Sequence, residues 1–391
     1  MNLSNFKITE DPRLVRRGAE TGLTLYSAYR PLRFKELYGS AAIAGQGIKQ
    51  SIINNNGKLP QAAIAFTGFS GTGKTTLALI TALALNCQNR DKDFEPCLKC
   101  AKCKGIINRG FEGTDPYFKV KNTAKMKQDD IISMVDNDIK SGTALINRRG
   151  GTRIICLEEA HNLTKKSIEN LLLPVENVLT SARRARVHVF LTSSESDTLF
   201  ANKAWQSRIL SVNLSRFTSQ DIFNILIDIA KNEHEHKNRP KITRDVLAKI
   251  IDVSELSLRH AITLLQGIIE QAHPDKETIK VEDTGILLGV DESWDSTDAF
   301  IKSLVAGNKK SCYTFLKDAY LRHNISFESI GTNVVKKLTS KGIMLLAGGD
   351  PAGDKYLAMA RAFNTTLSNS LYQDRFSALG LATSAALDKL G

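Results

Sequence analysis

Residues 68–75 have the composition and spacing of a loop that binds phosphate. They read Gly-Phe-Ser-Gly-Thr-Gly-Lys-Thr and fit the pattern G-x-x-x-x-G-K-[ST]. Glycines let the backbone turn tightly enough for several N–H groups to point at one anion, and a following helix N-terminus adds partial positive charge. In such a loop Lys74 would reach the β and γ phosphates, and the hydroxyl of Thr75 would ligate Mg²⁺. The predicted nucleotide site comprises Gly68, Phe69, Ser70, Gly71, Thr72, Gly73, Lys74, Thr75 and Thr76.

Two adjacent carboxylates, Glu158 and Glu159, end a second apolar run at residues 154–157. A carboxylate at the carboxyl end of a strand beside a phosphate loop can hold the Mg²⁺ shell, and its neighbour can orient or deprotonate the attacking water. Alone, this pattern also fits a strand that simply leaves the core, but the upstream phosphate loop favours hydrolysis. We interpret the nearby His161 as a structural or coupling residue, because phosphoryl transfer does not require imidazole chemistry.

Polar side chains also follow a further apolar run, residues 187–192. The hydroxyls of Ser193 and Ser194 at that strand end are predicted to lie beside the γ-phosphate. Arg208 stands at the close of the same region, where an arginine could reach the nucleotide of a neighbouring subunit. These residues complete a candidate site for phosphoryl transfer.

Four of the six cysteines lie within 17 residues, in the pattern C-x₉-C-x₂-C-x₂-C. They are Cys87, Cys97, Cys100 and Cys103. Four thiolates can surround one tetrahedral Zn²⁺ and leave no position open for water, so the predicted centre is structural. The alternative is a set of unliganded thiols, which two overlapping C-x₂-C pairs disfavour. Cys156 and Cys312 stand alone in apolar surroundings and are predicted to be core residues.

The elements that must position these residues are short strands alternating with helices. Apolar runs predict buried strands at 62–67, 117–120, 154–157 and 187–192, and a helix of good helix formers over 77–85. The phosphate loop thus lies between a strand and a helix, which is the context that its chemistry requires. After Phe217 the apolar spacing becomes helical throughout, with Ser219 as the expected N-cap of the first helix.

Charge is distributed unevenly along the 391 residues, whose formal net charge is +12. Residues 1–217 hold 32 Lys and Arg against 19 Asp and Glu, whereas residues 218–391 hold 21 against 22. One triphosphate does not need such an excess, so nucleic acid is a predicted second partner, and a solvated basic surface is the alternative. The sequence contains no run of 18 apolar residues, which excludes a membrane-spanning helix and makes the cytoplasm the expected location.

These features together predict three domains. Residues 1–217 would form an α/β P-loop domain with the cysteine module at 87–103 inserted in it, residues 218–290 a small helical domain, and residues 291–391 a further helical unit.

The order of the motifs resembles that of the gamma/tau subunits of the bacterial DNA polymerase III clamp loader. The resemblance rests on an ordered set: Tyr29-Arg30-Pro31, the loop at 68–75, the four cysteines, Glu158-Glu159-Ala160-His161, Ser207-Arg208 and Leu258-Arg259-His260-Ala261. It implies an AAA+ ATPase domain made of a parallel sheet with flanking helices, then a helical lid and a helical collar. The collar would join five subunits in a ring that opens a sliding clamp and places it on primer-template DNA for a DNA polymerase.

The resemblance also implies a role for each matching residue. Arg30 and Pro31 would lie near the adenine, and Glu158 would hold Mg²⁺ while Glu159 activates water. Ser193 or Ser194 would sense the γ-phosphate, Arg208 would act on the adjacent subunit, and Arg259 would act in its own site. The implied cofactors are ATP, Mg²⁺ and Zn²⁺.

Two other functions remain open. A non-hydrolysing stator or scaffold subunit of the same complex also carries the zinc module, but it has no need of Lys74, Thr75 and Glu159. Another AAA+ DNA motor, such as a helicase loader or branch-migration helicase, is disfavoured by the four-cysteine insert and by the C-terminal third. Glu158 stands where the family usually has Asp, so its carboxylate extends one methylene further.

Overall fold

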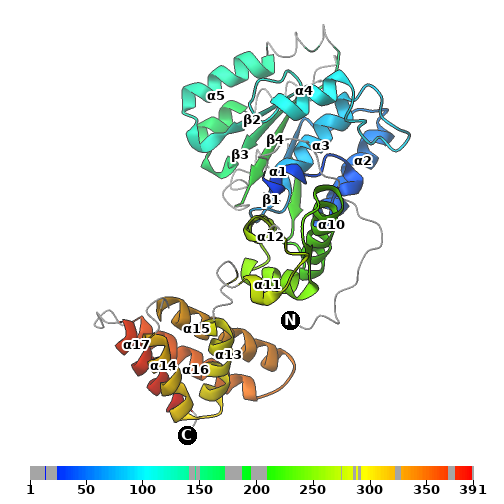
Figure 1. Ribbon diagram of the computed structural model, residues 1–391. Helices are drawn as coiled ribbons and strands as arrows, with labels where there is room; N and C mark the ends of the chain where they lie inside the picture. The colour runs from blue at the N-terminus through cyan, green and yellow to red at the C-terminus, as the bar shows by residue number, and fades with distance from the viewer. Residues whose placement is uncertain are drawn as a thin grey trace. The chain divides into compact units, whose positions relative to one another are not determined.

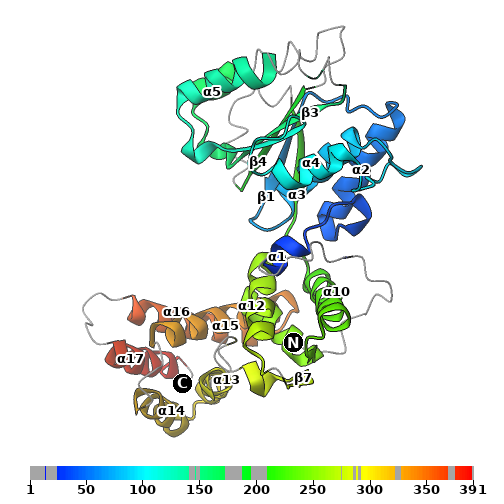
Figure 2. The same cartoon turned by 45° about the horizontal axis from the view of Figure 1, so that its top comes forward.

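The computed structural model divides the chain into two compact units, Met1–Lys280 and Val281–Gly391 (Figures 1 and 2). The described residues are Leu14, 24–140, Ile146, 150–171, 187–194, 209–273, 275–284, Leu288, 292–321, 327–368 and 375–389. Across these ranges, no helix is both long and apolar enough to span a membrane.

Five parallel strands form the sheet of the first unit, in the order β2-β3-β4-β1-β5. The strands are β1 (Ala63–Gly68), β2 (Phe118–Asn122), β3 (Arg153–Glu158), β4 (Val187–Ser193) and β5 (Leu210–Leu214). The three central strands are buried along almost their whole length, which explains their continuous apolar sequences. The four strands predicted from apolar runs are confirmed to within two residues at their ends.

Helices cover both faces of this sheet, with α5 on one side and α2, α3 and α4 on the other (Figure 1). An apolar core lies on each face of the sheet, and alternate residues of β1 point into one core or the other. Ile64 and Phe66 pack on the side of α3, whereas Ala63 and Ala65 pack on the side of α5. The helical elements that precede β4 in this part of the unit are α1 (Leu25–Ala28), η2 (Phe34–Glu36), α2 (Gly39–Asn54), α3 (Lys74–Asn86), α4 (Ala101–Arg109), η3 (Thr123–Lys125), α5 (Gln128–Met134), η4 (Val135–Lys140) and η5 (Ala160–Asn162). The expected fold class, a parallel α/β domain followed by helices, is confirmed.

The helices described after the sheet in the first unit are α10 (Ser219–Lys237), α11 (Arg244–Ser254) and α12 (Leu258–Gln271). The expected N-cap of α10, Ser219, is wrong by one residue. Thr218 is the cap, because its backbone is still extended and its hydroxyl accepts a hydrogen bond from the N–H of Asp221 at 3.1 Å. The Asp221 carboxylate in turn accepts from the Thr218 N–H at 3.0 Å, which completes a capping box.

Short strands are the main departure from the expected elements. The region after Phe217 is not helical throughout, because Lys241–Ile242 (β6) pairs with Thr278–Ile279 (β7). The two connecting segments thereby satisfy each other's backbone hydrogen bonds. The edge strand β5 was also not expected, although its apolar residues alternate with Ser211 and Asn213.

The second unit is helical, as expected. It contains α13 (Glu292–Val305), α14 (Lys309–Leu321), α15 (Phe327–Ala347), α16 (Ala352–Leu367) and α17 (Arg375–Leu387), and it starts with η6 (Val281–Thr284). Among its described residues, an apolar cluster that includes Phe300, Val334, Met359 and Phe363 forms the core. Cys312 lies fully buried in this cluster, as predicted, and Cys156 is equally buried in the sheet of the first unit.

A buried histidine in β4 should make the first unit sensitive to mild acid. Burial lowers the pKa of His188 to about 4, although the neutral ring donates from Nδ1 to the carbonyl of Gln61 at 2.6 Å. Between these two pKa values His188 is protonated in the unfolded chain but stays neutral in the folded chain. Stability is therefore lost as pH falls from about 6.5 toward 4. We expect the free energy of unfolding to drop by about 2 kcal/mol between pH 7 and pH 5 from this residue.

Urea denaturation of the wild type and of His188→Gln at the two pH values checks this expectation. The variant should lose less stability than the wild type over this pH interval. An equal loss in both proteins would show that His188 does not carry the pH dependence.

Candidate functional site

The phosphate loop joins the end of β1 to the start of α3 and depends on its glycines. Gly68, Gly71 and Gly73 all have positive φ, at 132°, 82° and 96°. A Cβ added at Gly68 would lie 2.1 Å from the carbonyl oxygen of Leu214 in β5, so no larger residue fits there. The loop therefore depends on backbone conformations that favour glycine, and it leads directly into the N-terminus of α3.

Lys74 folds back over its own loop. Its Nζ donates to the carbonyl oxygens of Gly68 and Phe69, at 2.6 and 2.8 Å. Burial lowers the pKa of Lys74, whereas the nearby charge of Glu159 raises it. The ammonium group is thus held against the carbonyl oxygens of the loop.

Thr75 and Glu158 meet across the site. The Thr75 hydroxyl donates to Oε1 of Glu158 at 2.6 Å. The extra methylene of Glu158, relative to Asp, therefore still allows its carboxylate to reach the threonine that would share Mg²⁺ with it. A hydroxyl and a carboxylate oxygen in contact are suitable donors for this hard cation.

Glu159 has a strained backbone and an accessible carboxylate. Its φ of 56° lies in the left-handed region, which is uncommon for residues other than glycine and clusters at functional sites. The Thr123 hydroxyl contacts the carbonyl oxygens of both Glu158 and Glu159, at 3.0 and 2.7 Å, and so supports this turn. The Glu159 side chain is 49% exposed, so a water molecule can approach it.

His161 connects Glu159 to the end of β4. Its Nε2 lies 3.4 Å from Oε2 of Glu159, and its Nδ1 lies 3.2 Å from Oγ of Ser193. Ser193 is fully buried, whereas Ser194 is exposed. The coupling role proposed for His161 matches this geometry, because one imidazole ring contacts both a candidate base and a candidate γ-phosphate sensor.

Arg259 approaches the phosphate loop from the first turn of α12. A Cβ at Gly71 would lie 3.7 Å from its backbone nitrogen. Its guanidinium donates to the hydroxyl of Tyr26 at 3.3 Å, and that hydrogen bond, with the charges of Glu158 and Glu159, raises the pKa of Arg259. A helix outside the sheet thereby supplies a permanent positive charge to the site.

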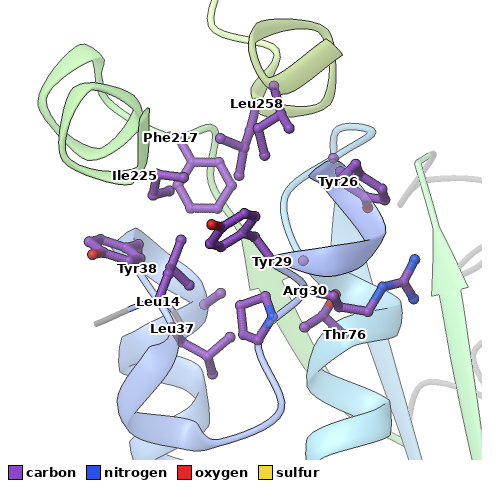
Figure 3. A pocket seen from close by; sticks show the side chains of 15 residues that line it. Leu14, Tyr26, Tyr29, Arg30, Leu37, Tyr38, Thr76, Phe217, Ile225 and Leu258 are labelled. Atoms are coloured by element: carbon purple, nitrogen blue, oxygen red, sulfur yellow. The ribbon is translucent and has the colours of Figure 1, made fainter. Parts of the chain in front are cut away.

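An apolar cavity adjoins the loop (Figure 3). Its lining comprises Leu14, Tyr26, Tyr29, Arg30, Pro31, Leu37, Tyr38, Ala41, Gly71, Gly73, Thr76, Phe217, Ile225, Leu258 and Ile262. Figure 3 shows the Arg30 side chain directed away from Tyr29 and Phe217, and its guanidinium lies 5.5 Å from the centroid of the Tyr26 ring. Its guanidinium stacks 4.4 Å from the Phe111 ring centroid; burial lowers its pKa, and the charges of Tyr26 and Glu158 oppose that.

The four cysteines converge, as expected for a metal centre. Their sulfur atoms all lie within 4.8 Å of one another, and none forms a disulfide. Burial raises the pKa of Cys97, but hydrogen bonds from the N–H groups of Lys99 and Cys100 outweigh it and bring the pKa to about 6. Four thiol groups at such distances suit Zn²⁺, whose bonds to sulfur are about 2.3 Å long.

The remaining predicted position, Arg208, lies outside the described residues together with Ser207. Conversely, sequence reasoning missed Tyr26, Phe111 and Thr123, which contact predicted site residues. Only Thr123 carried a signal, because it follows an apolar strand whose neighbour in the sheet ends at Glu158.

Known proteins provide a comparison for this geometry. The model of a family described as "DNA polymerase III, delta subunit" matches residues 46–217. A gamma/tau subunit of DNA polymerase III from Mycoplasma genitalium is 31% identical over 316 residues, which are 79% of this chain and 46% of that protein. The chain resembles the gamma and tau subunits of DNA polymerase III.

Other gamma subunits show the same similarity. That of Buchnera aphidicola subsp. Baizongia pistaciae is 27% identical over 317 residues, which are 80% of this chain and 77% of that subunit. The chain spans 46% of the Mycoplasma genitalium gamma/tau protein and 32% of the one from Mycoplasma pneumoniae. Among solved structures, a Thermotoga maritima RuvB branch migration motor superposes with a TM-score of 0.46 and 15% identity, over 78% of this chain and 84% of that one.

Proposed function

We propose that this gamma/tau-like chain is an ATP-hydrolysing motor subunit of a sliding-clamp loader. The observation that carries the proposal is the contact of Thr75 with Glu158 at 2.6 Å, beside the accessible carboxylate of Glu159. Thr75 and Glu158 would hold Mg²⁺, which when bound supplies positive charge opposite the β and γ phosphates. The cation partners of the site would be Lys74 and Arg259 in the same chain and Arg208 toward the next subunit.

Each of the chain's own site residues would have a role in an in-line attack of water on the γ-phosphorus. Lys74 would exchange its contacts with carbonyl oxygens for phosphate oxygens, and Arg259 would neutralise charge as the bond to the β-phosphate breaks. Glu159 would orient the attacking water and accept its proton, while Ser193 or Ser194 would respond to the γ-phosphate. The apolar cavity would hold the adenine against Pro31.

Hydrolysis would be linked to assembly and to DNA. By analogy with the gamma and tau subunits, the partners are a sliding clamp, other loader subunits in a five-membered ring, primer-template DNA and a DNA polymerase. The basic excess of residues 1–217 is suited to the DNA backbone. Chromosome replication would place the protein in the cytoplasm.

A stator subunit is the second candidate. The four-cysteine segment is consistent with it, but a scaffold has no use for a complete set of phosphate, Mg²⁺ and water-activating residues. Another DNA motor, such as a helicase loader, is less consistent with the cysteine segment.

Affinity purification of the chain from its native source, followed by mass spectrometry, tests the proposal directly. We expect a sliding clamp and loader subunits to co-purify, and we expect clamp and primer-template DNA together to stimulate ATP turnover severalfold. The proposed function would be contradicted if clamp and primer-template DNA did not change ATP turnover, or if no sliding clamp co-purified with the chain.

A further inference from the structure

The segment from Tyr29 to Tyr38 borders the nucleotide cavity at both of its ends. Tyr29, Arg30 and Pro31 line the cavity at the start of the segment, and Leu37 and Tyr38 line it at the end (Figure 3). Between them the backbone forms only the short helix η2. Backbone N–H groups in such an irregular stretch need partners from elsewhere.

Two buried carboxylates provide those partners. Glu36, within the segment, accepts from the N–H groups of Leu32 and Arg33 at 2.8 and 3.3 Å. Glu95 accepts from the N–H groups of Phe34 and Lys35 at 2.9 and 3.2 Å. Glu95 is only 4% exposed, and the ammonium group of Lys49 lies 3.4 Å from it.

Glu95 belongs to the four-cysteine segment. It stands two residues before Cys97, and its own N–H donates to the carboxylate of Asp91 at 2.8 Å. The next residue, Pro96, accepts from Nε of Arg33 at 3.2 Å, and the N–H of Cys97 then donates to the sulfur of Cys87 at 3.2 Å. An unbroken series of short contacts therefore runs from the thiols to η2.

The same segment is tied to α10. The Tyr29 hydroxyl donates to Glu233 at 2.9 Å, and the Tyr38 hydroxyl donates to Asp228. Its two ends are thus held by a helix that also contributes Ile225 to the cavity, and its middle is held by Glu95.

We propose that Glu95 is a positioning residue that couples the four-cysteine centre to the nucleotide cavity. When the thiolates are gathered by zinc, Glu95 holds η2 and fixes the cavity wall on both sides of it. When zinc is absent and the four thiols separate, Glu95 no longer holds the N–H groups of η2 in place. The cavity wall then becomes less ordered, and nucleotide binds more weakly. The inference rests on the proposed binding of a nucleoside triphosphate, but not on hydrolysis, a clamp or DNA. Linkage requires the reverse effect as well: bound nucleotide should strengthen zinc binding.

The test measures the affinity for a fluorescent, non-hydrolysable ATP analogue before and after zinc is removed by a chelator. The proteins are the full-length wild type, Glu95→Gln, which keeps one acceptor oxygen, and Glu95→Ala, which keeps none. Asp93→Asn is the matched control, because Asp93 is an exposed carboxylate of the same segment. Zinc content and melting temperature are measured on every sample.

We expect chelation to raise the Kd of the wild type and of Asp93→Asn roughly tenfold, equivalent to ~1.4 kcal/mol. Glu95→Gln should start with a Kd already raised, and chelation should then change it little, because the coupling residue is gone. Hydrogen exchange in the nucleotide-free proteins should show faster exchange of the Phe34 and Lys35 amides after either treatment.

The proposal would be overturned if chelation and substitution had additive effects on the free energy of analogue binding. It would also be overturned if chelation left the Kd of the wild type unchanged. If Glu95→Ala does not fold, Glu95→Gln and the exchange of the two amides still decide the question. A wild type that binds the analogue but fails to load a clamp would contradict the proposed function and leave this inference standing.

Discussion

Replacing Glu159 with Gln is expected to reduce ATP turnover by about 10²–10⁴-fold, the usual contribution of a general base. Gln has nearly the same shape as Glu, but it cannot accept the proton of the attacking water. The substitution leaves Lys74, Thr75 and Glu158 in place, so the affinity for ATP should hardly change. Single-turnover hydrolysis and analogue binding, measured on the same preparation, separate the two effects.

Glu169→Gln provides the control for this experiment. Glu169 is exposed in the same unit, so the same chemical change there should leave turnover unaffected. Equal turnover in Glu159→Gln and the wild type would contradict the proposed role of Glu159 in activating water.

Changing Cys103 to Ser is expected to abolish metal binding. The wild type should contain about one zinc ion per chain, because four thiolates complete one tetrahedral centre. Cys103 is fully buried and lies in the first turn of α4, so its loss should also loosen the packing of that helix on α3. Elemental analysis and thermal melting measure the two consequences.

Cys312→Ala serves as the comparison, since Cys312 is a buried thiol in the core of the other unit and is not a member of the four-cysteine cluster. It should keep its full zinc content. A wild-type protein that is folded and free of metal would refute the zinc assignment.

Local sequence patterns predicted the sheet because parallel central strands are apolar on both faces. Residues 154–157 and 187–192 could therefore be recognised without knowing their neighbours, and the polar residues that follow them were placed at one edge by the rule for parallel strands. The phosphate loop could also be recognised from local sequence, since its glycines and Lys74 lie within eight residues.

Contacts between distant segments could not be predicted in this way. Glu95 and Phe34 are 61 residues apart, and Tyr26 and Arg259 are 233 apart, so no periodicity connects them. The cap of α10 was misplaced by one residue because Thr218 and Ser219 are both good caps, and only the backbone conformation distinguishes them.

The hydrogen bonds that Lys74 makes to its own loop bear on how quickly a nucleotide can associate. Because the lysine already cross-links the backbone at Gly68 and Phe69, the loop is ordered before any ligand arrives. Its conformational entropy is lost when the protein folds, and association then requires only an exchange of oxygen partners around one ammonium group. Association of a nucleotide would consequently not require the phosphate loop to fold first.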